Sequence, residues 1–199
     1  MKSFTRYTVL FVMLMTAVNF SMAQEVSRTR GKLDFLKGET SINIELTYDK
    51  MSVGEFNKEA DYIKKKKEEM NEKDVATGTT WATKWDEDKK DRFPAKFILG
   101  FTNTSKMTVS ADAKYTLIFN TKALEPGYQA GISKKNAGID GTVTIVETAD
   151  RTKKLATLAI ERPGSNMFRG ASFDAGARIA DAYYLSGQKL GKFIVKGDE

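Results

Sequence analysis

Three stretches in the second half of the chain alternate between apolar and polar residues, and this pattern constrains the fold most strongly. They cover residues 115–120, 142–148 and 155–160. A period of two is typical of strands with one buried face. Only a few residues separate the last two stretches, so we expect them to pair as an antiparallel hairpin.

The first half of the chain predicts one strand followed by helices. Residues 42–48 alternate in the same way, and Ser52 with Glu55 three residues later forms a capping box that predicts a helix start. The inward stripe of that helix is expected to comprise Phe56, Ala60, Ile63 and Met70.

Trp81 and Trp85 indicate a second helical segment, which Pro94 separates from the apolar residues that follow. We expect two short helices meeting near Phe93. A long helix over residues 175–196 should close the chain, with Gly197 as its C-cap. Its expected stripe is Ile179, Tyr183, Leu190, Phe193 and Ile194.

This order of elements predicts an α+β fold. We expect a two-layer sandwich with a mostly antiparallel sheet of about four to five strands and three to four helices on one face. Residues 24–32 are polar and are expected to be loose, and residues 33–199 should form a single domain.

The first 23 residues are typical of an export signal. Lys2 and Arg6 precede an apolar run over residues 8–18, and small side chains at Ser21 and Ala23 favour a cut before Gln24. Eleven helical residues rise about 16 Å, roughly half the thickness of a hydrocarbon core. We therefore expect no transmembrane segment after cleavage, and a periplasmic or secreted product.

Composition excludes several chemistries. The 199 residues include no histidine and no cysteine, which rules out histidine-based triads, thiol nucleophiles, disulfides and the usual structural zinc sites. The lysine run at residues 64–67 is flanked by acids, which is typical of a solvated helix face and gives no reason to expect nucleic acid as a partner. We expect no cofactor and no bound metal.

The best candidate for a recognition surface is the stretch over residues 125–141, which carries four glycines between two predicted strands. Connections of this length are often functional, although an added edge strand or a long hairpin would also account for it. The candidate binding residues are Tyr128, Lys134, Lys135 and Asn136, together with Arg169 from the next loop.

The segment over residues 114–196, including KYTLIFNTKALEPG and FDAGARIADAYYLSGQKLGKFI, resembles a family of uncharacterised exported proteins of Gram-negative gut bacteria. The strand order is also remotely similar to the amino-terminal α/β domain of TolB and related envelope proteins. That resemblance implies a role through protein contacts rather than catalysis, and it transfers no site residue.

The favoured function is therefore an exported, non-catalytic binding or adaptor module of the cell envelope, with an envelope protein or another macromolecule as its partner. A first alternative is a glycan hydrolase that uses two carboxylates, Glu147 and an acid such as Asp174. A second is a small-ligand carrier with a cavity between helices and sheet.

Overall fold

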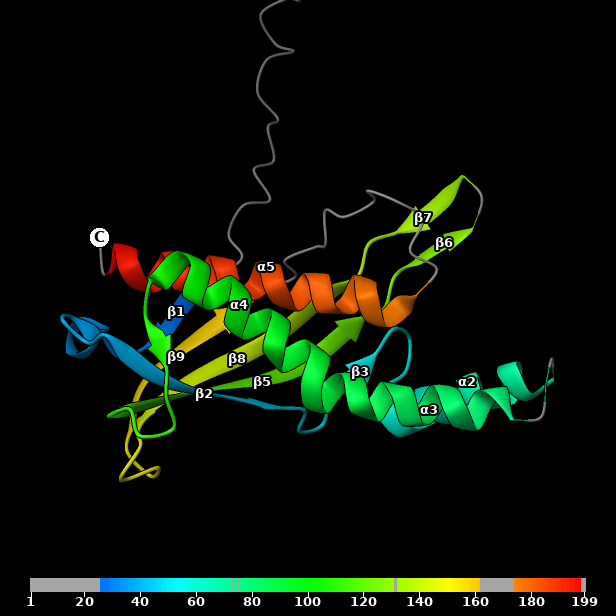
Figure 1. Cartoon of the computed structure of the whole chain (residues 1–199), viewed down its shortest axis with the longest axis horizontal. Helices are drawn as coiled ribbons and strands as arrows, with labels where there is room; N and C mark the ends of the chain where they lie inside the picture. The colour runs from blue at the N-terminus through cyan, green and yellow to red at the C-terminus, as the bar shows by residue number, and fades with distance from the viewer. Residues whose placement is uncertain (1–25, 73, 75, 131, 162–173, 198–199) are drawn as a thin grey trace, which may run out of the picture.

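The computed structural model describes residues 26–72, 74, 76–130, 132–161 and 174–197 (Figure 1). The predicted export signal and Arg169 lie outside these residues. The strands are β1 (Val26–Arg30), β2 (Ser41–Thr47), β3 (Ser52–Val53), β4 (Thr108–Val109), β5 (Tyr115–Glu125), β6 (Tyr128–Ala130), β7 (Ser133–Lys135), β8 (Gly138–Glu147) and β9 (Lys154–Ile160). The helices are α2 (Glu59–Asn71), α3 (Thr77–Glu87), α4 (Phe93–Ser105) and α5 (Ala175–Lys196), with a 3₁₀ turn at Asp34–Leu36 and a π-helical segment at Asp88–Arg92.

The chain is α+β, as predicted, but its main sheet has seven strands rather than four to five. The sheet is mixed: the β1–β9, β9–β8 and β8–β5 pairings are antiparallel, and the pairings of β2 and β3 with β5 and of β4 with β2 are parallel. Its order is β1-β9-β8-β5-β2-β4, and β3 also pairs with β5. The predicted β8–β9 hairpin is confirmed as antiparallel. By contrast, β2 runs parallel to β5, because helices α2 to α4 connect them and return the chain to the same end of the sheet.

The amino-terminal segment also differs from expectation. Residues 24–32 were expected to be loose, whereas Val26–Arg30 form edge strand β1 along β9. Only Val26 in this strand is buried, so its sequence carries little of the alternation that reveals a strand. Backbone hydrogen bonds to β9 hold this strand in the sheet, because its side chains bury little apolar surface.

One face of the sheet is apolar and fully covered. Its central side chains have no solvent exposure and include Ile42, Leu117, Phe119, Val143 and Leu158. Helices α4 and α5 run over the sheet, while α2 and α3 extend beyond its end (Figure 1). The helical layer over the sheet is therefore smaller than the predicted three to four helices.

Helices α4 and α5 pack with their backbones in close contact, because glycines lie where they meet. A side chain at Gly100 would collide with the carbonyl oxygen of Tyr184, and one at Gly187 would collide with that of Phe97. The Thr104 hydroxyl donates to the carbonyl oxygen of Gln188, 2.9 Å away, across the helix pair. This pair forms the helical layer over the sheet (Figure 1).

The predicted helix start at Ser52 was wrong. Ser52 and Val53 form β3 on β5, and α2 begins only at Glu59. Val53 is fully buried there, so the burial of an apolar side chain in the sheet overrides the local capping signal. The shift changes the inward stripe: Tyr62 is the buried residue of α2, and the expected Ala60 is exposed.

The two short helices predicted to meet near Phe93 form one continuous helical stretch over residues 77–105. The Phe93 amide donates to the carbonyl oxygen of Asp88, five residues earlier, which is the π-helical pattern. Pro94 has no amide hydrogen and would clash with the carbonyl four residues earlier in a regular helix. The wider turn accommodates the proline without ending the helix.

The closing helix agrees with prediction in its bounds and largely in its stripe. It spans Ala175–Lys196 and is followed by Gly197 with φ of 70°. Ile179, Tyr183, Leu190 and Ile194 are buried, whereas Phe193 is only partly buried. Within the described residues, no helix combines the length and the apolar character needed to cross a membrane.

Candidate functional site

The predicted recognition loop is a projecting two-stranded hairpin. β5 extends to Glu125 and β8 begins at Gly138, which shortens the connection, and β6 pairs with β7 inside it. Figure 1 shows this hairpin standing away from the end of the main sheet. The structure thus corrects the expectation of a long irregular loop and agrees with the hairpin alternative.

Four of the five predicted site residues belong to this hairpin or follow it directly. Tyr128 lies on β6, Lys134 and Lys135 lie on β7, and Asn136 comes next. All four are exposed, and Tyr128 exposes 48% of its surface. Lys135 forms an ion pair of 2.6 Å with Glu125, which ties β7 to the end of β5.

A cavity of about 840 Å³ lies beside the base of the hairpin, and we call it the helix-end cleft. Four separate parts of the chain line it: α2, α3, the turn from β5 into β6, and the start of α5. Representative lining residues from these parts are Tyr62, Trp81, Lys84, Tyr128, Asp174 and Arg178. Of the four predicted site residues that the structure describes, Tyr128 lines this cleft.

Aromatic side chains form one wall of the helix-end cleft. Trp81 and Trp85 lie 5.6 Å apart at an interplanar angle of 30°, and Tyr62 meets Trp81 edge-on at 5.8 Å. Trp85 is buried, and its indole N–H donates to Glu59 at 2.6 Å. Trp81 is only half-buried, so it presents surface to the cleft while its neighbours hold its ring in place.

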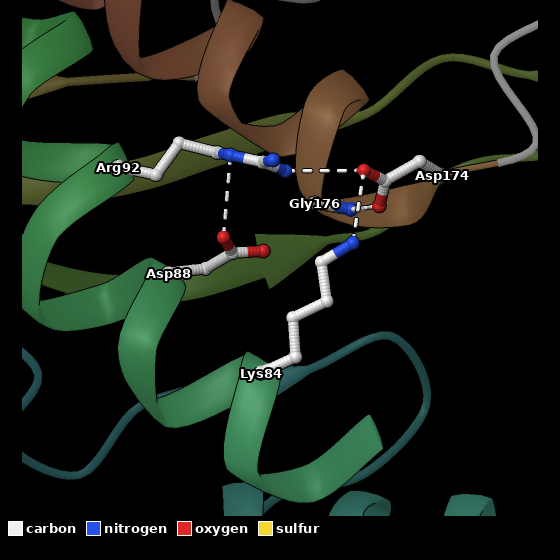
Figure 2. Close-up of polar contacts among 5 residues, drawn as sticks. All are labelled: Lys84, Asp88, Arg92, Asp174 and Gly176. Carbon is white, nitrogen blue, oxygen red and sulfur yellow. Dashed lines mark hydrogen bonds and ion pairs between the residues drawn. The ribbon is translucent and has the colours of Figure 1, made fainter. Parts of the chain in front are cut away.

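A network of charged side chains lies at the start of α5, as Figure 2 shows. Arg92 bridges two carboxylates: its Nε lies 3.2 Å from Asp88 and its Nη1 lies 3.1 Å from Asp174. Lys84 approaches Asp174 at 3.4 Å, and the Gly176 amide donates to the same carboxylate at 2.9 Å. Asp174 is therefore the N-cap of α5 as well as an ion-pair partner.

The two carboxylates in this network have opposite pKa shifts. Burial raises the pKa of Asp88, and the nearby Asp174 charge adds to this while Arg92 opposes it. Burial alone would also raise the pKa of Asp174, but the hydrogen bond from Arg92, the charge of Lys84 and the Gly176 amide lower it below its ordinary value.

Arg178 connects α5 to the turn between β5 and β6. Its Nε donates to the carbonyl oxygen of Pro126 at 3.3 Å and its Nη2 donates to that of Gly127 at 2.9 Å. Gly127 has φ of 63°, a conformation that favours glycine. These contacts fix the base of the β6–β7 hairpin beside the helix-end cleft.

A second, smaller cavity of about 360 Å³ adjoins the helix-end cleft, because Tyr62, Lys66 and Tyr128 line both. Lys135 lines the smaller cavity and, with Asn136, a third one of about 470 Å³. Burial raises the pKa of Tyr62 to about 12. Tyr128, Lys135 and Asn136 thus border neighbouring cavities.

The carboxylates proposed for hydrolysis do not come together. Glu147 ends β8 opposite Tyr115 and forms an ion pair with Lys153 at 2.6 Å. Asp174 lines the cleft with Pro126, which follows the other end of β5. At about 3.3 Å per residue, the length of β5 puts these two acids on the order of 30 Å apart, far beyond the spacing that hydrolysis needs.

Sequence reasoning missed Asp88 and Arg92 as site residues. They stand four residues apart in a charged run, which predicts an ion pair on a helix but does not indicate that Asp88 lines a cleft. Among the residues that the structure describes, no group of three or more carboxylates converges in a way that could hold a metal ion.

Comparison with solved structures gives weak likenesses, among them two to PelC structures. No protein-family model matches the chain, and no curated protein matches it. A PelC dodecamer from Paraburkholderia phytofirmans is similar over 80% of this chain and 96% of its own, with 9% identity and a TM-score of 0.35. A PelC variant from the same organism covers 81% of this chain and 97% of its own, with 12% identity and a TM-score of 0.35. At that level of similarity we draw no conclusion from them.

Proposed function

We propose that this protein is an exported, non-catalytic binding module of the cell envelope, and that it binds its partner at the helix-end cleft and the adjoining β6–β7 hairpin. The observation that carries the proposal is the convergence of four separate chain segments on one cavity of about 840 Å³. Cavities of this size with a few fixed polar groups are typical of binding sites.

The hydrogen bonds and ion pairs of the charged side chains favour a binding role over catalysis. Asp174 already accepts from Arg92, Lys84 and the Gly176 amide, so its oxygens stabilise the helix start. The pair expected for hydrolysis lies at opposite ends of the sheet. The carrier alternative placed its cavity between helices and sheet, whereas this cleft is lined by α2, α3, the turn from β5 into β6 and the start of α5.

Export is part of the proposal and rests on residues 1–23. Mass spectrometry of the full chain after expression in Gram-negative cells should find a product that begins at Gln24, in the periplasm or the medium. A product that retains Met1 and stays in the cytoplasm would contradict export and leave the cleft argument untouched.

The binding surface is tested by placing a photo-crosslinking amino acid at Tyr128 in cells that produce the full chain. The matched control carries the same group at Val195, which is 62% exposed on α5. We expect a discrete covalent adduct from position 128 and none from position 195. Equal adducts from both positions, or none from either, would contradict the assignment.

A further inference from the structure

We infer that the ligand of the helix-end cleft is a neutral glycan strand, with one sugar ring packed on Trp81 and the strand continuing past Tyr128. This inference rests on the proposed function and names the class of ligand for the same site. The combination that points to it is an aromatic surface and a set of charged hydrogen-bonding groups that balance over the cleft and the cavity adjoining it.

Trp81 provides the surface for an apolar ring face. Its contacts with Trp85 and Tyr62 hold the indole in place, so binding orders little that is not already ordered. Tyr128 lines the same cleft from the hairpin and is half exposed. Aromatic rings offer large rigid contact areas, which the C–H face of a sugar ring can cover.

The charges that line the cleft exclude other ligand classes. Three bases (Lys66, Lys84 and Arg178) and two acids (Asp88 and Asp174) line the cleft. The adjoining cavity adds two bases and three acids, so a strongly charged ligand of either sign would meet like charges along the two cavities. A wholly apolar ligand would remove these charged groups from water without returning hydrogen bonds, which is costly. A neutral ligand rich in hydroxyls satisfies them, because each hydroxyl both donates and accepts.

The shape of the site favours a strand over a single sugar. The cavity of about 360 Å³ shares Tyr62, Lys66 and Tyr128 with the helix-end cleft, so the two form one groove along the base of the hairpin. A single ring packed on Trp81 would leave the part beside Tyr128 empty. A linear glycan fills both.

Calorimetric titration with three soluble hexasaccharides tests the inference: chitohexaose, cellohexaose and maltohexaose. Dextran sulfate and a neutral hexapeptide serve as ligands of other classes. We expect at least one hexasaccharide to bind and to shift the tryptophan emission, since Trp81 is one of two tryptophans in the chain. Trp81→Ala should weaken that binding at least about tenfold.

Two further variants keep the test clear of folding effects. Tyr128→Ala changes an exposed side chain and should weaken binding by several-fold without altering the circular dichroism spectrum. Leu99→Ala changes a residue that is 46% exposed on α4 and should leave binding unchanged.

Absence of binding by all three hexasaccharides at millimolar concentration would overturn the inference, as would unchanged affinity in both Trp81→Ala and Tyr128→Ala. Binding of dextran sulfate or the peptide in place of the sugars would assign another ligand class and overturn it too. An adduct at position 128 together with any of these results would leave the proposed binding surface standing and reject only the glycan.

Discussion

At the scale of single residues, Tyr183 is a buried side chain of α5 that contacts both another helix and the sheet. Its ring is fully buried and stacks on Phe93 at 5.0 Å, and its hydroxyl lies 2.7 Å from that of Thr121 on β5. Phe193 on the same helix is only partly buried. The sequence pattern marked both residues as equal members of the stripe, and the structure distinguishes them.

Truncation of these two side chains should therefore have different costs. We expect Tyr183→Ala to lower the free energy of unfolding by about 3–5 kcal/mol, and Phe193→Ala by less, about 1–2 kcal/mol. Tyr183→Phe should cost about 1–2 kcal/mol, because it leaves the buried Thr121 hydroxyl without this partner. Urea denaturation measures all three, and equal losses from the two alanine variants would contradict the assigned burial.

Two polar residues at element starts give a second comparison. Asp174 caps α5 through the Gly176 amide, so Asp174→Ala should cost about 1–2 kcal/mol. Ser52 caps no helix. Its hydroxyl donates to the backbone carbonyl oxygen of Lys122 in an exposed hydrogen bond of 3.3 Å. Ser52→Ala should change stability by less than about 0.5 kcal/mol. Thermal unfolding of both variants tests this, and a larger loss at Ser52 would speak for the capping box.

At the scale of elements, the glycines between α4 and α5 decide how closely the helices approach. Glycine to alanine at an unhindered helix position is stabilising by roughly 1 kcal/mol. At Gly187 the added methyl group would meet the Phe97 carbonyl oxygen, so we expect Gly187→Ala to be destabilising by about 1–3 kcal/mol.

Gly138→Ala is the matched control for that substitution. No atom lies within 4 Å of the added methyl group, and the backbone there does not require glycine. Its effect on stability should stay within about 0.5 kcal/mol. Chemical denaturation of both variants gives the comparison, and a stabilised Gly187→Ala protein would show that the helices lie further apart than described.

At the scale of the whole molecule, buried tyrosines make stability depend on alkaline pH. Burial raises the pKa of Tyr48 and Tyr183 as well as that of Tyr62, which reaches about 12. In the unfolded chain these phenols ionise near pH 10. The folded state therefore keeps protons that the unfolded chain loses, and the free energy of unfolding falls as pH rises from about 10 to about 12.

The variant Tyr62→Phe isolates one of these contributions. Its free energy of unfolding should fall less steeply than that of the unmodified chain above pH 10, and the two curves should run parallel below it. Urea denaturation at several pH values, with tyrosinate absorbance followed in parallel, provides the measurement. Parallel curves across the whole range would contradict the raised pKa of Tyr62.

The sequence alone predicted the elements in which the spacing of apolar side chains shows which face is buried. The alternation of Leu117 and Phe119 marked β5, and the spacing of Ile179, Tyr183 and Leu190 marked α5 with its bounds. It also pointed to the hairpin residues Tyr128 and Lys135 that border the cavities. These features follow from local periodicity and turn chemistry, which a single chain displays directly.

Only the tertiary structure decided which segments pair and which side chains meet. β1 and β3 are held by backbone bonds to β9 and β5, so their own residues carry little signal. The charged network joins Lys84 and Arg92 to Asp174 across more than 80 positions of sequence. Contacts between distant positions depend on how the layers pack, and neither periodicity nor spacing along the chain encodes that.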